Sequence, residues 1–122
     1  MVSLSIMVVD DSQLAIRKME TMLVALGHKV VQTAANGSVA IDNYRKALPD
    51  LVTMDITMPE MSGIEATGKI IAEFPDAKII MVTSHGQEDM VRQAIKAGAR
   101  GYVMKPVDVD ALTMHIERVI NL

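Results

Sequence analysis

Residues 6–12 read Ile-Met-Val-Val-Asp-Asp-Ser, an apolar run that stops abruptly at two acids and a serine. A short run that is apolar on both faces is typical of a buried strand in a parallel sheet. Ser12 is a good N-cap, and apolar residues then recur at helical spacing as far as Gly27, which predicts a helix. The predicted inner face of this helix consists of Ala15, Met19, Met22, Leu23 and Leu26.

The same strand–helix unit recurs along the rest of the chain. Further strands are predicted at residues 28–33, 51–54, 78–82 and 101–104, and further helices at about 36–48, 64–74, 88–97 and 108–120. Five such units predict an α/β fold of the flavodoxin-like type, a doubly wound five-stranded parallel sheet flanked by five helices. The strand order 2-1-3-4-5 is the expected one, although alternation alone leaves other orders open.

The composition limits what the protein can be. The chain has 122 residues, the size of one domain, and half of them are apolar, which is enough for a sizeable core. Its 12 basic and 15 acidic residues give a net charge of −3, so no nucleic-acid partner is expected. The absence of cysteine excludes a disulfide scaffold and a thiol nucleophile. No apolar run suits membrane insertion and no signal peptide is recognisable, so a cytoplasmic protein is expected.

Polar residues collect at the carboxyl ends of the predicted strands. Asp10 and Asp11 follow the first strand, Asp55 the third, Thr83 the fourth and Lys105 the fifth. In a doubly wound sheet the ligand site lies beyond these ends. Neighbouring carboxylates repel one another unless a cation lies between them, and Mg²⁺, or alternatively Mn²⁺, suits an all-oxygen ligand set. A lysine and a hydroxyl at the same edge favour an anion, for which a phosphoryl group is the best candidate.

Each of these residues also has an ordinary structural explanation. An Asp after a strand is usually a turn former or an N-cap, Thr83 can cap a helix, and Lys105 before Pro106 can be a solvated surface residue. It is improbable that all of these structural explanations hold together at the ends of four strands. His28 and His115 have no second metal-ligating residue at useful spacing, so neither is expected to bind a metal. His28 is expected at the surface and His115 on the flank of a helix.

Four segments resemble the receiver domain of two-component response regulators, most closely the stand-alone, CheY-like chemotaxis type. They are Val8–Ser12, Met54–Gly63, Val82–Ser84 and Ala97–Pro106, and the string Asp-x-x-Met-Pro-x-Met-x-Gly with the later Lys-Pro is the most specific part. The likeness runs from the first strand to the last helix, so residues 1–122 are expected to form a single receiver domain. The family is itself a known example of the strand order 2-1-3-4-5.

The resemblance implies a role for each residue of the site. Asp55 would be the nucleophile that takes a phosphoryl group from a histidine kinase and becomes an aspartyl phosphate. Lys105 would pair with the phosphoryl oxygens, and the Lys105–Pro106 bond is expected to be cis. Mg²⁺ would be held by Asp11 and Asp55 directly, by Asp10 mostly through water, and by the backbone carbonyl of Thr57.

A second set of residues would couple phosphorylation to output. Thr83 would move to hydrogen-bond the phosphoryl group beside the backbone N–H of Ser84, and Tyr102 would swing into the space that Thr83 leaves. Thr57 and His85 would flank the path of the water that removes the phosphoryl group and would tune the rate of that step.

The resemblance implies a signalling protein and not an enzyme in the usual sense, because it would catalyse only its own phosphorylation and dephosphorylation. Its output would come from the face formed by the fourth helix, the fifth strand and the fifth helix. This face would bind a partner such as a flagellar motor switch component, and a phosphatase is a further candidate partner.

Other functions are weighed against this one. Binding of FMN is disfavoured because Asp10 and Asp11 would repel its phosphate, and a haloacid-dehalogenase-like phosphatase would need a second Asp where Thr57 stands. Three alternatives stay open on the sequence: a phosphorelay intermediate, a receiver-fold interaction module read without phosphorylation, and a receiver excised from a larger regulator.

Overall fold

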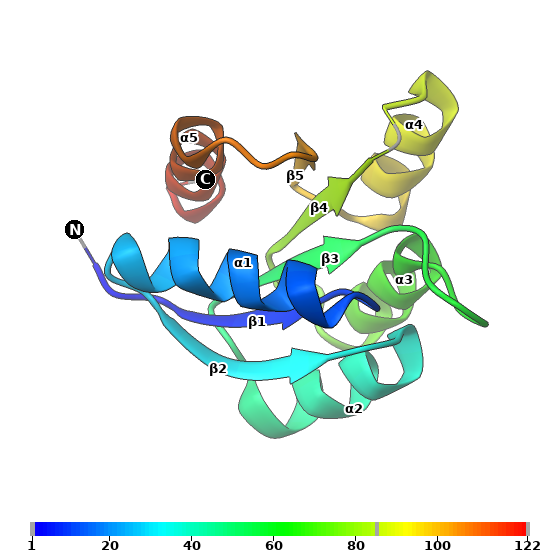
Figure 1. The fold of residues 1–122 in the computed structure, drawn as a ribbon. Helices are drawn as coiled ribbons and strands as arrows, with labels where there is room; N and C mark the ends of the chain where they lie inside the picture. The colour runs from blue at the N-terminus through cyan, green and yellow to red at the C-terminus, as the bar shows by residue number, and fades with distance from the viewer. Residues whose placement is uncertain (1, 85, 122) are drawn as a thin grey trace.

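The structure is a computed structural model that describes residues 2–84 and 86–121. The strands are β1 (Ser5–Val9), β2 (Lys29–Ala34), β3 (Leu51–Asp55), β4 (Ile79–Thr83) and β5 (Gly101–Met104). The helices are α1 (Gln13–Ala25), α2 (Gly37–Ala47), α3 (Gly63–Glu73), α4 (Glu88–Ala97) and α5 (Val109–Ile120). They alternate along the chain as the sequence predicts (Figure 1). None of the helices in the described part of the chain is long and apolar enough to cross a membrane.

The strands form one parallel sheet in the order β2-β1-β3-β4-β5, which confirms the predicted fold class and strand order. The arrows in Figure 1 accordingly point to one edge of the sheet. In the ladder Asp55 is level with Val82, and Thr83 is level with Met104. This register brings the carboxyl ends of β3, β4 and β5, and hence Asp55, Thr83 and Lys105, to the same edge.

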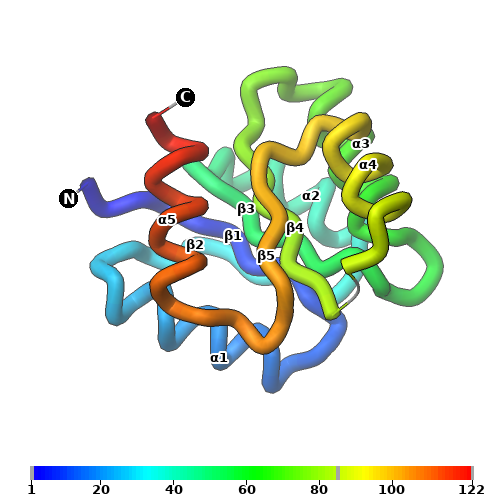
Figure 2. Tube along the Cα trace, turned by 90° about the horizontal axis from the view of Figure 1, so that it is seen from above, coloured from blue at the N-terminus to red at the C-terminus, as the bar shows by residue number. Residues whose placement is uncertain are grey.

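The two faces of the sheet carry separate apolar cores, because side chains along a strand alternate between faces. One core packs α1 and α5 against residues such as Ile6 and Val82, and the other packs α2, α3 and α4 against residues such as Met7 and Met54. Figures 1 and 2 show these helices on opposite faces of the sheet. Strands β3 and β4 are buried along their whole length, which explains why most of their residues are apolar.

The predicted inner face of α1 is right for Met19 and Leu23 but omits Ile16, which is also buried. The other predicted residues, Ala15, Met22 and Leu26, are half-buried. Ala15 lies at the side of the apolar stripe, where α1 borders a cavity instead of packed side chains. The hydroxyl of Ser12 accepts a hydrogen bond from the Ala15 N–H at 3.2 Å, so the predicted N-cap is confirmed.

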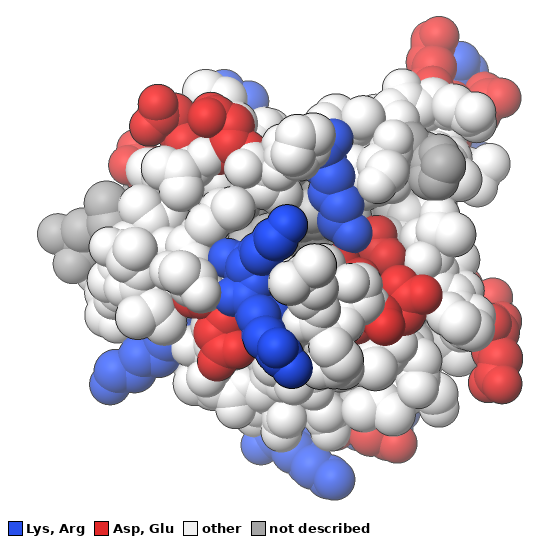
Figure 3. Space-filling model, in the orientation of Figure 1, with Lys and Arg blue, Asp and Glu red and all other residues white. Residues whose placement is uncertain are grey.

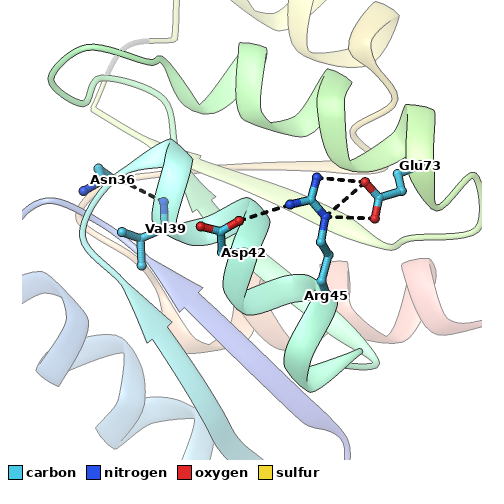
Figure 4. A network of polar contacts seen from close by, with 5 residues as sticks. All are labelled: Asn36, Val39, Asp42, Arg45 and Glu73. Carbon is cyan, nitrogen blue, oxygen red and sulfur yellow. Dashed lines mark hydrogen bonds and ion pairs between the residues drawn. The ribbon is translucent and has the colours of Figure 1, made fainter.

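The helices α2 and α3 are joined across their exposed sides by a small polar network (Figure 4). Arg45 donates to both carboxylate oxygens of Glu73 at 2.9–3.1 Å, and its Nη1 lies 3.1 Å from Asp42. At the start of α2, Asn36 accepts a hydrogen bond from the Val39 N–H at 2.9 Å and caps the helix. Exposed pairs of this kind contribute at most about 1 kcal/mol, so the network orients α2 against α3 more than it stabilises the fold.

His28 is buried, with 6% of its surface exposed, so the prediction of a surface histidine is wrong. Its Nδ1 accepts a hydrogen bond from the Leu4 N–H at 3.2 Å, and the following residue, Lys29, donates to the Leu4 carbonyl at 2.9 Å. His28 therefore lies directly before β2, and its imidazole accepts a hydrogen bond from a backbone N–H of the segment that leads into β1.

Candidate functional site

Three carboxylates converge at the carboxyl edge of the sheet. Asp10 and Asp11 follow β1, Asp55 is the last residue of β3, and one carboxylate oxygen from each lies within 4.8 Å of the other two. Asp10 and Asp55 are both 6% exposed, whereas Asp11 is exposed. The structure thus brings together the three acids that the sequence places at strand ends.

The ammonium group of Lys105 reaches into this acidic cluster. Its Nζ lies 2.7 Å from Asp10 Oδ2 and 3.5 Å from Asp55 Oδ1. The backbone holds the lysine there, because the Lys105 N–H donates to the Thr83 carbonyl at 2.8 Å and the Lys105–Pro106 bond is cis, as expected. Burial favours a lower pKa for Lys105, but the hydrogen bond to Asp10 and the charges of Asp55 and Asp10 outweigh it and raise the pKa. The lysine therefore stays charged.

The charges of the cluster are not balanced. Burial, followed by the nearby charge of Asp10, raises the pKa of Asp55 from 3.8 to about 6, against the opposing effect of Lys105. One ammonium is insufficient for three carboxylates, so a further cation would relieve the repulsion. The three acids offer oxygen ligands at one accessible point, and this donor set fits Mg²⁺.

The residues expected to act as the switch lie on neighbouring strands, Thr83 at the end of β4 and Tyr102 on β5. Thr83 is buried with 1% exposed, and Tyr102 is half-buried. Burial raises the pKa of the Tyr102 hydroxyl, while a side-chain hydrogen bond with Thr83 works in the opposite direction. Ser84 and Thr57 are exposed at the same edge, and His85 lies outside the described residues. The roles expected for these residues stay predictions.

Gly63 is a residue whose importance sequence reasoning missed. It begins α3, its N–H donates to the Ile56 carbonyl at 2.8 Å, and a Cβ at this position would overlap the backbone carbonyl of Asp55. The glycine therefore allows α3 to start directly against the backbone of the buried acid. The sequence did carry a signal. A glycine directly follows Ser62, the N-cap of α3, at a position where a helix by itself would favour a larger residue.

Comparison with known proteins gives consistent matches over nearly the whole chain. The family model described as the response regulator receiver domain matches residues 6–117. Chemotaxis protein CheY of Bacillus subtilis is 42% identical over 116 residues, which cover 95% of this chain and 97% of that protein. Chemotaxis protein CheY of Thermotoga maritima is 39% identical over 114 residues, which cover 93% of this chain and 95% of that protein. Among solved structures, a chain of the CheX-CheY-BeF3-Mg²⁺ complex from Borrelia burgdorferi aligns with a TM-score of 0.91 and 30% identity, over 94% of this chain and 87% of that chain.

Proposed function

The chain belongs to the response regulator receiver domain family, as a CheY-like member, and we propose that it accepts a phosphoryl group from a histidine kinase on Asp55. Receiver domains are signalling proteins and not enzymes in the ordinary sense. The observation that carries the proposal is the convergence of Asp10, Asp11 and Asp55 within 4.8 Å, with the Lys105 ammonium 3.5 Å from Asp55.

The acidic cluster would hold Mg²⁺ through Asp10, Asp11 and Asp55, together with the backbone carbonyl of Thr57. When bound, Mg²⁺ neutralises negative charge on phosphoryl oxygens. The presence of Mg²⁺ and BeF3 in the Borrelia complex supports this assignment. Mn²⁺, which prefers similar oxygen ligands, is the alternative ion.

The reaction proposed for Asp55 is a simple displacement. A carboxylate oxygen attacks the phosphorus, so an O–P bond forms while the P–N bond to the kinase histidine breaks, and the leaving imidazole takes a proton from solvent. A pKa of about 6 leaves Asp55 mostly ionised at neutral pH, as a nucleophile must be. Lys105 already lies 3.5 Å from Asp55, so its ammonium can pair with the oxygens of the incoming group without crossing the site.

Output would follow from the contact between Thr83 and Tyr102. Movement of the Thr83 hydroxyl toward the phosphoryl group would break its hydrogen bond with Tyr102 and change the face formed by α4, β5 and α5. This face exposes large apolar side chains that suit a protein partner, namely Ile95, Met104 and Met114. Because the Bacillus and Thermotoga relatives are chemotaxis proteins, the proposed partner is a flagellar motor switch component.

The phosphoacceptor role is tested by intact-protein mass spectrometry after incubation with acetyl phosphate and Mg²⁺. We expect one added phosphoryl group in the parent, none in Asp55→Asn, and none when a chelator replaces Mg²⁺. Asp76→Asn, which removes an exposed acid outside the cluster, should behave like the parent. A parent that gains no phosphoryl group under rapid quench would contradict the proposal and favour an interaction module that is read without phosphorylation.

The output proposal has its own test. Binding to a purified motor switch component is measured with and without acetyl phosphate. The variant Ile95→Asp should lose the phosphorylation-dependent binding, whereas Val24→Asp, which changes a similarly exposed apolar residue on α1, should retain it. Equal loss in both variants, or no response to acetyl phosphate, would contradict the proposed face.

A further inference from the structure

A cavity of about 560 Å³ opens between α1, the sheet and the segment that joins β5 to α5. Its floor is formed by side chains of the sheet, and its walls by Met19 and Met22 of α1 and by Val107 beyond β5. Most of this lining is apolar. The volume falls within the range of about 300–1,000 Å³ that is usual for small-molecule sites.

One polar group is buried in the floor of this cavity. Thr53 lies in the middle of β3 and is only 2% exposed. Its hydroxyl forms no hydrogen bond to another residue in the described part of the chain. Every fully buried side-chain N or O atom in that part has a hydrogen-bond partner, so the Thr53 hydroxyl oxygen is not fully buried. The hydroxyl therefore opens into the cavity. A buried polar group without a protein partner points to an occupant that can bond to it.

The rim of the cavity carries one basic side chain, Lys18, that pairs with no acid in the described part of the chain. The charged lining residues of the cavity are Lys18, Lys105 and Asp10. Both oxygens of Asp10 are already engaged, Oδ1 by the Ser12 N–H at 2.9 Å and Oδ2 by Lys105 at 2.7 Å. Lys18 is exposed and forms no ion pair with any residue that the structure describes. Figure 3 shows Lys and Arg side chains on both sides of a hollow on this face of the molecule.

We propose that this cavity is a binding site for a small amphipathic monoanion. An aromatic or aliphatic body would lie between α1 and the sheet, against Met19 and Met22. A sulfonate or carboxylate head would pair with Lys18 at the rim, and a polar atom of the body would reach the Thr53 hydroxyl. The cavity shares Asp10 and Lys105 with the phosphoacceptor cluster and extends from it along α1.

The probe for this site is 8-anilinonaphthalene-1-sulfonate, an aromatic monoanion whose fluorescence reports binding. We expect saturable binding of one molecule to the folded full chain. Lys18→Glu should weaken this binding by about fivefold, the upper range for an exposed ion pair. It should leave the binding of N-phenyl-1-naphthylamine, the uncharged analogue, unchanged. Lys29→Glu makes the same charge change at an exposed residue outside the cavity and should alter neither probe.

The position of the probe is tested by filling the cavity. Ala15 lines it, and Ala15→Leu should weaken both probes by about tenfold or more, because the added side chain occupies the space of the ligand body. Where this variant does not fold, methyl NMR of the labelled methionines in the parent replaces it. The signals of Met19 and Met22 should then respond to the probe, and those of the exposed Met104 and Met114, which do not line the cavity, should not.

Three results would overturn the proposal. Unchanged affinity of both probes in a folded Ala15→Leu variant would show that they bind elsewhere and that the cavity holds only water. Equal loss of sulfonate binding in Lys18→Glu and Lys29→Glu would show a general charge effect instead of a pair with Lys18. Methionine shifts confined to Met104 and Met114 would place the probe on the output face.

Discussion

Replacing Asp55 by Asn should make the protein more stable when Mg²⁺ is absent. Asp55 is buried beside Asp10, and burial together with that charge raises its pKa from 3.8 to about 6. The ionised carboxylate is therefore disfavoured in the folded protein relative to the unfolded chain. Asn keeps the shape of the side chain but carries no charge, so the variant lacks this cost.

The size of the effect follows from the pKa. A change from 3.8 to about 6 corresponds to about 3 kcal/mol between the two protonation states, which is the full effect at neutral pH. For an acid whose pKa is raised by folding, the folded state holds the proton more tightly, so stability falls as the pH rises through the interval between the two values. The advantage of Asp55→Asn should therefore be below about 1 kcal/mol near pH 4 and complete above about pH 7.

The assay is equilibrium urea denaturation in chelator at pH 4 and pH 7.5, with Asp76→Asn as the matched control. Asp76 is exposed, so its replacement removes the same net charge without relieving the cluster. The free energy of unfolding of Asp55→Asn should exceed that of the control by up to about 3 kcal/mol at pH 7.5. If the two variants are equally stable at pH 7.5, or if their difference is the same at both pH values, the inferred cost of burying the Asp55 charge beside Asp10 is absent.

Three further substitutions or treatments have equally definite outcomes in the same denaturation assay. Gly63→Ala should lower the free energy of unfolding by about 2 kcal/mol or more because its Cβ would overlap the Asp55 carbonyl. Gly68→Ala in the same helix, where a Cβ would make only an ordinary contact with Ala97 at 4.0 Å, should raise the free energy of unfolding by about 1 kcal/mol, and shifts of the same sign in the two variants would contradict this contrast. Mg²⁺ at ten times its dissociation constant should stabilise the parent by about 1.4 kcal/mol and Asp55→Asn by less, and an equal gain would mean that the ion binds elsewhere. Leu48→Gly should stabilise the protein by about 1 kcal/mol because Leu48 ends α2 with a φ of +44°, which favours glycine. Leu14→Gly, at an equally exposed position within α1, should destabilise the protein. A loss of stability in Leu48→Gly would show that the left-handed turn is not strained.

The sequence predicted the fold and the acidic cluster because both depend on where strands end. Runs such as residues 6–9 are apolar on both faces only in a covered parallel sheet, and in such a sheet every carboxyl end lies at one edge. Asp10, Asp55 and Lys105 could therefore be placed together without knowledge of a single tertiary contact. The resemblance then added the chemistry, which charge and spacing alone left open.

The features that the sequence did not reveal depend on packing at particular positions. Nothing local distinguishes a surface His28 from one that accepts the Leu4 N–H, because the partner lies far away in the sequence, in the segment that leads into β1. Helical periodicity could not decide between Ala15 and Ile16 for the core, because the cavity beside α1 leaves Ala15 without a packed neighbour. Thr53 did carry a signal, since it is a polar residue within an otherwise apolar buried stretch of β3, but its significance requires the cavity to be seen.

The cost of burying charge in the acidic cluster suits the proposed role as a switch. A cost of about 3 kcal/mol at Asp55 is a sizeable part of the about 5–15 kcal/mol that stabilises a domain. It is tolerated because β3 and β4 are buried on both faces and hold the edge of the sheet in place. A cation bound at Asp55 would relieve the part of this cost that comes from the charge of Asp10, and that part would add to its binding free energy by linkage. Since Lys105 bonds to Asp10 and is anchored to the Thr83 carbonyl, a change in charge at the cluster acts directly on the β4 and β5 ends from which output would be read.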